Sequence, residues 1–317
     1  IVIPGSVLTN VSYSFSGMMR ASGYPQKSMY TILIGVVLNV ILDPIFIFGF
    51  GLGIQGAAIA TVISMFVSAV FVMSHFFNPK HVVHFEKGCM HLRGYIIRNI
   101  TSIGMAPFLM NVAACGVNII MNHQLVRQGG DLAIGAYGIL NSYAILIVMS
   151  VMGLCQGMQP IVGYNYGAQN RRRMMATIKR STLYACCIMV FGTVLFWAIP
   201  DTLLRLFDAS DVMLAAGVPA LRIISLSFCM AGACIALGSS FQALGKSMYS
   251  MVTSIVRQLV FLIPIAYVLA RYGASVGNSD LVWWCYPLAE IFSLTLTLVF
   301  FSRMYKTIIA PLPEGHE

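Results

Sequence analysis

NVILDPIFIFGFGLG, residues 39–53, sets one carboxylate into an otherwise apolar stretch of the chain. Asp43 is the only ionisable residue in this stretch, and Asn39 lies four positions earlier. A helix therefore places both side chains on one face. Because a charge at the middle of a bilayer costs about 2.5–3.5 kcal/mol on insertion scales, an Asp in such a stretch is usually either functional or well paired. The simpler interpretation is that Asp43 only caps the helix, or pairs with another side chain, near Pro44.

The composition of the whole chain is that of a membrane protein. Of its 317 residues, 58% are hydrophobic and 9% are charged, and the mean hydropathy is +0.83, whereas a soluble domain averages about 25% charged residues. The net charge of +9 comes from Lys and Arg in short loops between apolar runs. Such loops are typical of membrane proteins, so we expect no nucleic-acid partner. The cysteines and histidines lack the spacing of a zinc site, and we expect no metal.

Apolar windows of about 20 residues predict nine membrane-spanning helices. If the connections alternate sides, most Lys and Arg residues fall on one side, which the positive-inside rule assigns to the cytoplasm together with the C-terminus. The three tryptophans fall at the predicted outer ends, where an aromatic belt is expected. The chain opens with Ile inside an apolar run, which indicates a fragment without its true N-terminus. The predicted spans are residues 1–19, 30–48, 54–77, 98–125, 132–163, 177–199, 214–244, 248–270 and 281–302.

The longest and most polar connection predicts a division into two helical lobes. Residues 78–97 are interpreted as a cytoplasmic linker between a lobe at 1–77 and a lobe of six helices at 98–305, with a cytoplasmic tail at 306–317. An internal repeat supports two lobes, because duplicated helical bundles are common in transporters. With a slip of two positions, Pro44 also corresponds to Pro264. The repeat consists of Ala21, Gly23, Ser28 and Met29, which recur 222 residues later as Ala243, Gly245, Ser250 and Met251.

Polar residues in the apolar segments of the second lobe predict a cavity there. Asn111, Asn118 and Asn122 stand at i, i+7 and i+11, on one face of a helix. The same residues would serve equally well as hydrogen-bonding contacts between helices. Arg257 and Glu290 lie deep in apolar segments, where they either pair or face water. The candidates for the cavity are Asn118, Asn122, Tyr137, Asn141, Gln156 and Arg257.

Three stretches together resemble a known family. They are MRASGYPQKSMY at 19–30, LNVILDPIFIFGFGLGIQGAAIATVIS at 38–64 and QPIVGYNYGA at 159–168. The chain is similar over its whole length to the MATE (multidrug and toxic compound extrusion) family, in particular to its bacterial MepA-like exporters. The resemblance implies an all-α, two-lobe fold of twelve helices, of which this chain would carry the last three of the N-lobe and all six of the C-lobe.

The resemblance also implies a function and a site. Some members bind a cation in the N-lobe through an Asp on the first helix, an Asn and an Asp on the fifth and a Thr on the sixth. Asn39, Asp43 and Thr61 match the last three, and the first-helix Asp would precede Ile1. The chain is then expected to be part of a monomeric antiporter in the bacterial plasma membrane. It would use Na⁺ or H⁺ as its coupling ion, without a further cofactor, to export lipophilic and often cationic compounds.

Three alternatives to an antiporter stay open from the sequence. A lipid-linked oligosaccharide flippase shares the two-lobe plan, but it would need several cations for a pyrophosphate, and only Arg257 and Arg222 are candidates. A membrane-embedded enzyme is disfavoured, because no Ser/His/Asp set or HExxH motif falls in the apolar segments. The third alternative is an inactive fragment.

Overall fold

The computed structural model describes residues 2–313 except 87, 89, 90, 92, 208–210, 277 and 278. For residues 2, 4, 106, 120–134, 136, 212, 216, 274 and 279 it describes the backbone alone. The described backbone is helical apart from turns and one irregular connection between Phe76 and Gly94. The chain divides into two compact units, Ile1–Arg93 and Gly94–Glu317, which are described separately below.

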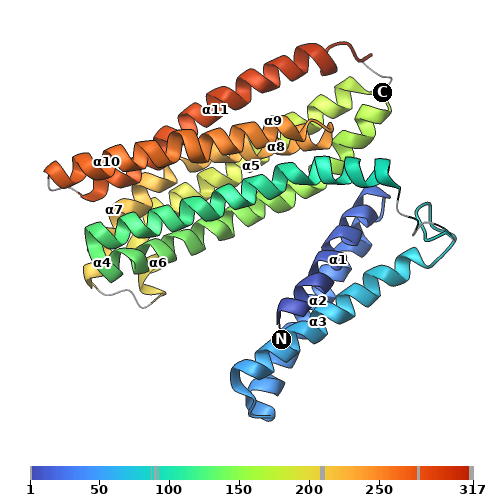
Figure 1. The fold of residues 1–317 in the computed structure, drawn as a ribbon, viewed down its shortest axis with the longest axis horizontal. Coiled ribbons are helices and arrows are strands. Elements are labelled where there is room, and N and C mark those ends of the chain that lie inside the picture. Colours follow the sequence, from blue (N-terminus) through green and yellow to red (C-terminus); the bar gives the residue numbers. More distant parts are fainter. Residues whose placement is uncertain are drawn as a thin grey trace. The chain divides into compact units, whose positions relative to one another are not determined.

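The first unit consists of three long helices and a π-helical turn (Figure 1). Helix α1 (Val2–Ala21) and helix α2 (Pro25–Pro44) both pack against α3 (Gly53–Phe76). The π-turn η1 (Ile45–Gly49) continues α2 beyond Pro44. Pro25 stands in the first turn of α2, where the missing N–H of proline is tolerated. The buried centre of this unit is formed by Met19, Val72 and Phe76, with Phe15 and Phe85 packed against it.

The second unit is a larger helical bundle (Figure 1). Helices α5 and α8 pack along one another, and both contact α4. Its elements are α4 (Gly94–Gly167), α5 (Arg171–Ala198), α6 (Pro200–Arg205), α7 (Asp211–Ser225), α8 (Phe228–Ala243), α9 (Ser247–Ile255), the π-helix η2 (Val256–Leu262), α10 (Ile263–Val276), the 3₁₀-helix η3 (Ser279–Trp284), α11 (Cys285–Met304) and the π-turn η4 (Tyr305–Ile309).

Helix α4 contains two membrane spans that run in opposite directions. Its backbone is helical over 74 residues, yet the Tyr137 hydroxyl lies 3.3 Å from Asn118 Oδ1. In a straight helix those residues, 19 positions apart, would be separated by about 28 Å. The chain must therefore reverse between them. The two arms, Gly94–Ile119 and Tyr137–Gly167, each qualify as a span, as the sequence predicted.

Seven described helices are long and apolar enough to cross a membrane, and an eighth span is formed by α7 and α8 if that bent pair counts as one. The pair bends by 48°. At the bend Thr193 donates a 2.8 Å bond to the Ser225 carbonyl, so this carbonyl keeps a partner where the helix is broken. The all-α membrane fold is confirmed, but the predicted span at 1–19 does not qualify. Helix α1 is 20 residues long, and its six hydroxyl side chains and Asn10 make it less apolar than the others.

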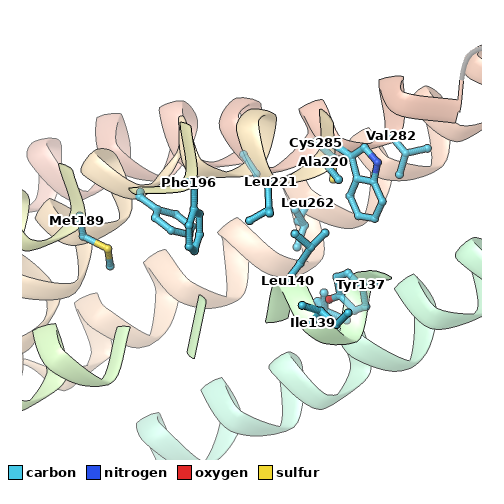
Figure 2. Packing of buried hydrophobic residues seen from close by; sticks show 14 of the residues in the cluster. Tyr137, Ile139, Leu140, Met189, Phe196, Ala220, Leu221, Leu262, Val282 and Cys285 are labelled. Carbon is cyan, nitrogen blue, oxygen red and sulfur yellow. The ribbon is translucent and has the colours of Figure 1, made fainter. Parts of the chain in front are cut away.

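Buried apolar side chains fill the interior of the second unit (Figure 2). Met189, Phe196 and Leu221 belong to one buried cluster, which also includes Leu140 and Leu262 from other helices. Large apolar side chains also cover the outside, as on α5, where Phe191 is 70% exposed. A helix that is apolar all round is typical of a membrane span, so we assign the outer surface to lipid contact.

The internal repeat extends to the backbone. The turn between α1 and α2, the first corner (residues 16–31), and the turn between α8 and α9, the second corner (residues 238–253), each contain a glycine with positive φ, 89° at Gly23 and 70° at Gly245. Each glycine follows the end of its first helix, where a left-handed residue closes the helix. Equivalent backbone bonds run from Tyr24 N to Met19 O at 2.9 Å and from Lys246 N to Phe241 O at 2.8 Å.

Side chains in the two corners repeat as well. Arg20 Nη1 donates to Ser28 Oγ at 3.0 Å in the first corner. Gln242 Nε2 donates to Ser250 Oγ at 3.2 Å in the second corner, again across eight positions. The Ser28 hydroxyl also lies 2.6 Å from that of Ser16. The four repeated identities in the sequence therefore mark one helix–turn–helix structure that occurs in both units.

Candidate functional site

The first unit brings together the three residues that the sequence pattern and the family resemblance selected. Asn39 Nδ2 lies 3.2 Å from Asp43 Oδ1 on the same helix and 3.4 Å from Thr61 Oγ1 on α3. The Thr61 hydroxyl donates to the Ala57 carbonyl at 2.8 Å, so its oxygen lone pairs face Asn39. All three side chains are partly buried. Asp43 makes no ion pair with any cation in the described part of the chain.

Local sequence fixes Asp43 at the end of α2. Pro44 follows directly and lacks an N–H, so regular helical bonding is disturbed at this point. The chain continues as the π-turn η1 and then reverses through Gly51 and Gly53, whose φ angles are 66° and 53°. This tight reversal lets α3 return alongside α2 and places Thr61 next to Asn39. A π-turn inside a helix is frequent at functional sites.

A cavity of about 370 Å³ adjoins these residues between α1, α2 and α3. Asn39 and Thr61 form part of its wall. Its other polar lining residues are hydroxyl side chains, which have no charge and offer oxygen atoms. They are Thr9, Ser12, Tyr13, Ser16, Thr31, Ser64 and Ser68. An uncharged and mainly apolar cavity with several hydroxyl groups therefore adjoins Asn39 and Thr61.

The oxygen atoms of the site are suited to a hard cation. A carboxylate, an amide and a hydroxyl supply the ligand type that hard cations prefer, whereas soft metals prefer thiolates and imidazoles. No group of three or more His, Cys, Asp or Glu side chains that could hold a metal ion occurs among the described residues. A single carboxylate without a cationic partner favours a monovalent cation or a proton over a highly charged ion.

A second group of predicted residues meets in the second unit. The Tyr137 hydroxyl bonds to Asn118 Oδ1 at 3.3 Å and lies 3.2 Å from the Tyr286 hydroxyl. Asn118, Tyr137, Asn141 and Arg257 line one cavity of about 320 Å³, which we call the upper cavity. Four of the six cavity candidates are thus found together.

The other two cavity candidates are not placed in this group. Gln156 lies on α4 but does not line the upper cavity. The side chain of Asn122 lies outside the described residues. Helical periodicity gave the correct face for Asn118, but it carried no information about how far along each helix the cavity extends.

Arg257 and Glu290 form an ion pair between two cavities. Arg257 Nη1 lies 2.6 Å from Glu290 Oε1. Both residues line the upper cavity and also a second cavity of about 320 Å³, the lower cavity, which extends to Ser250 and Thr297. The sequence left open whether the two charges pair, and it did not place Glu290 in the cavity. The sequence did hold evidence for the ion pair, because opposite charges in apolar spans are usually paired with one another. A pair that includes the cavity candidate Arg257 would also place Glu290 at the cavity.

Comparison with known proteins identifies the family. The family model described as MatE matches residues 102–268, just over half of the chain. The chain belongs to the MatE family. The relatives below are named export proteins, so the family is one of multi-pass membrane transporters and not of enzymes.

Named relatives and solved structures agree with this assignment. The chain is 29% identical over 264 residues to the multidrug export protein MepA of Staphylococcus aureus (strain MRSA252), which covers 83% of this chain and 57% of the relative. It is 27% identical over 298 residues to MepA of Staphylococcus saprophyticus, covering 93% and 65%. The chain therefore spans about three fifths of the length of these relatives.

Solved MATE structures share the fold. A crystal structure of MATE in complex with MaL6 matches with a TM-score of 0.87 at 20% identity, covering 98% of this chain and 69% of the other. Crystal structures of MATE in the bent and straight conformations match with TM-scores of 0.84 and 0.86 at 21% identity. Each covers 96% of this chain, and 68% and 69% of the matched chains respectively.

Proposed function

We propose that this chain is part of a cation-coupled exporter of small organic molecules, in which Asn39, Asp43 and Thr61 hold the coupling cation. One observation carries the proposal. A lone Asp in an apolar span is joined to an amide at 3.2 Å, and that amide reaches a hydroxyl on the next helix at 3.4 Å. An ionisable residue kept inside a membrane span without a counter-ion is more often functional than structural.

Either Na⁺ or H⁺ fits this arrangement. The Asp43 carboxylate and the Thr61 hydroxyl supply hard oxygen ligands for Na⁺. The Asn39 amide nitrogen bonds to both groups, so the amide would turn to bring its carbonyl oxygen to the ion. A proton needs only the carboxylate, so both ions compete for Asp43. An ion that moves inward to this site brings about 2.3 kcal/mol per 100 mV of membrane potential, which is sufficient to drive export against a gradient.

Coupling follows from the effect of the cation on packing. Binding of a cation neutralises Asp43 and removes the cost of keeping a charge between α2 and α3. The first unit then repacks around a neutral site, and the affinity for an exported molecule falls. By linkage, the exported molecule lowers the affinity for the cation by the same factor. The bent and straight conformations recorded for solved MATE structures are compatible with such repacking.

The exported molecules are proposed to be lipophilic and often cationic, bound by a transporter that acts as a monomer. The MepA relatives are named multidrug export proteins. The upper cavity combines Asn118, Tyr137 and Asn141 with apolar walls. A mainly apolar pocket with a few polar groups is the usual form of a site for small organic molecules.

We further propose that the two units are parts of two lobes in the bacterial plasma membrane, with the C-terminal end in the cytoplasm. The connection at 78–97 would be the cytoplasmic linker and 306–317 the tail. The basic residues near this end support the orientation. Arg171, where α5 begins, and Lys306, in η4 after α11, line one cavity of about 800 Å³. A green fluorescent protein fused after residue 317 should fluoresce in cells, and its failure to do so with membrane-inserted protein would argue against the orientation.

The flippase alternative loses support from the contacts of its two candidate cations. Arg257 is neutralised by Glu290 at 2.6 Å. The Arg222 guanidinium lies over the Trp197 ring at 6.0 Å, which indicates a role in packing. A pyrophosphate would need free cations in a shared cavity, and neither residue offers one.

The test is transport by the protein expressed from its complete reading frame in everted vesicles. Dye efflux is measured under an imposed Na⁺ gradient and, separately, under an imposed pH gradient. Asp43→Asn should abolish gradient-driven efflux, a loss of tenfold or more, because the neutral amide has no negative charge for the cation to bind and neutralise. Asp211→Asn is the matched control, because Asp211 is 89% exposed and, within the described part of the chain, forms an ion pair only with Arg205 at 3.1 Å. Efflux by Asp43→Asn at the wild-type rate with unchanged cation dependence would exclude the proposed coupling site.

A further inference from the structure

The cavity of about 800 Å³ at one end of the second unit, the basic cavity, lies where α5 begins and α11 ends (Figure 1). Both helices belong to segments that qualify as membrane spans, so these ends lie at a boundary of the bilayer. No acidic side chain among the described residues lines the cavity. Like charges that share a cavity repel one another and favour an anion between them. The cations that line it are Arg171, Arg172, Lys179 and Lys306.

Two of these cations are available to a ligand. The side chains of Lys179 and Lys306 are exposed, and neither makes an ion pair or a hydrogen bond in the described part of the chain. One belongs to α5 and the other to η4, yet both line the same cavity. An anion in the cavity therefore meets a positive charge from each of its two walls.

Arg171 joins the two walls of the basic cavity. Its Nη2 donates to the Tyr305 hydroxyl at 2.8 Å, and its Nη1 donates to the Ala310 carbonyl at 3.2 Å. The guanidinium also lies over the Tyr305 ring, 5.6 Å from its centre. Lys306 follows Tyr305 in the π-turn η4, a form that is frequent at functional sites. Walls that are fixed in this way lower the entropy cost of binding a ligand.

Apolar surface adjoins the cations. Met175 and Phe301 line the basic cavity itself. A neighbouring cavity of about 620 Å³ shares Ser302 and Lys306 with it and extends along α11 to Leu298, which is 49% exposed. In a helix, the eight positions from Leu298 to Lys306 correspond to about 12 Å. The two cavities together lead from cations at the bilayer boundary to apolar side chains inside the span.

We propose that these cavities bind an anionic phospholipid, with its phosphate at Lys179 and Lys306 and an acyl chain along α11 toward Leu298. A free phosphate would use the cations alone, whereas a lipid uses the cations and the adjoining apolar surface. Basic pockets between membrane helices are suited to anionic headgroups. A zwitterionic lipid is a poorer ligand, because the same cations repel its choline group. The inference goes beyond the export function and does not depend on it.

The test is native mass spectrometry of the protein expressed from its complete reading frame and purified in detergent. Dioleoylphosphatidylglycerol and dioleoylphosphatidylcholine, which differ in the headgroup alone, are titrated separately. Peak areas give the dissociation constant of the first bound lipid. The wild type should bind the phosphatidylglycerol about fivefold more tightly, or better. Lys179→Gln/Lys306→Gln should reduce this preference to less than about twofold, because it removes the two available cations.

Arg173→Gln/Arg180→Gln is the matched control. Both arginines are exposed on α5, and neither lines the basic cavity or its neighbour. This variant removes the same charge from the same end of the unit, so it should keep the wild-type preference. All four substituted side chains are exposed, and substitutions of that kind rarely affect folding. Helical circular dichroism checks that both double variants are folded.

Glycerophosphoglycerol, the same headgroup without acyl chains, distinguishes a lipid from a soluble phosphate. It should neither bind at the concentrations used for the lipid nor displace bound phosphatidylglycerol. Binding as tight as that of the lipid would assign the site to a soluble anion and overturn the inference. Equal binding of the two lipids by the wild type would also overturn it, as would a preference that survives in Lys179→Gln/Lys306→Gln. An equal loss of preference in both double variants would show a general attraction to basic surface in place of a site.

Discussion

The first corner and the second corner use the same backbone bonds, but the helices that leave them carry different charges. Helix α2 leads from the first corner to Asp43, which has no cationic partner among the described residues. Helix α9 leads from the second corner into η2 and Arg257, which is paired with Glu290 at 2.6 Å. One scaffold thus presents a lone acid in one unit and a neutral pair in the other. The geometry is shared, and the electrostatics is specific to each unit.

The largest expected effect concerns the ion pair of the second unit. Arg257→Met leaves Glu290 buried without its counter-charge, and breaking a buried pair in this way costs about 3–5 kcal/mol. We expect the lower end, because Arg257 keeps 30% of its side chain exposed. Unfolding of the purified chain, followed by circular dichroism during titration with denaturing detergent, measures the loss. Asp43→Asn in the first unit should cost less than about 1 kcal/mol, since it breaks no pair.

The double variant Arg257→Met/Glu290→Met should recover most of that stability. If the single and double variants were equally unstable, the pair would not be the source of the difference between the units. The difference in stability between the units would then come from the packing around η2.

An intermediate effect is expected at the two corner glycines. Gly23→Ala and Gly245→Ala each place a Cβ at positive φ, 89° and 70°, which costs about 1–2 kcal/mol for an L-residue. Nothing lies within 4 Å of a Cβ at either position, so the cost comes from the backbone alone and should be equal. Gly153→Ala, in α4, is the control, because its surroundings are equally open and its φ is not positive. Unequal losses at the two corners in detergent unfolding would show that the corners differ in strain.

The smallest effect concerns a contact of the first corner that the second corner lacks. Gly238 stands 222 positions after Ser16, and a Cβ added there would lie 3.3 Å from Ser250 Oγ. In the first corner the Ser16 and Ser28 hydroxyls are 2.6 Å apart. Gly238→Ser should form the equivalent bond and stabilise the helix by about 0.5–1 kcal/mol. The midpoint of detergent unfolding reports the change.

Ser16→Gly is the reverse exchange and should lower the stability of the first corner by a similar amount. A loss of stability in Gly238→Ser would mean that Ser250, held by Gln242 at 3.2 Å, does not move to admit the new side chain. The two corners would then be equivalent in backbone only.

The sequence predicted the parts of this structure that depend on short spacings. Asn39 and Asp43 are one helical turn apart, so their contact follows from the helix alone. Gly23 and Gly245 marked the corners, because a turn after a helix commonly needs a glycine at positive φ. Thr61 lies on another helix, and only the family resemblance selected it, since no spacing within one helix relates it to Asn39.

The sequence offered features that depend on packing between helices only as open alternatives or not at all. Arg257 and Glu290 are 33 positions apart, and the sequence left their pairing as one of two possibilities. Gln156 has the same polar character as Asn141, yet only Asn141 lines the upper cavity. The reversal within α4 was correctly expected from two apolar windows, although the helical backbone continues through it.

The bond between positions 20 and 28, and its counterpart between 242 and 250, also bears on how such a protein diverges after its gene is duplicated. Both serine hydroxyls receive an N–H donor, but the donor is charged in one copy and neutral in the other. A duplicated corner can therefore exchange arginine for glutamine without losing its shape. That freedom leaves Arg20 able to contribute to the orientation of the first unit across the bilayer. It also leaves Gln242 able to line the lower cavity, where an unpaired charge would be costly.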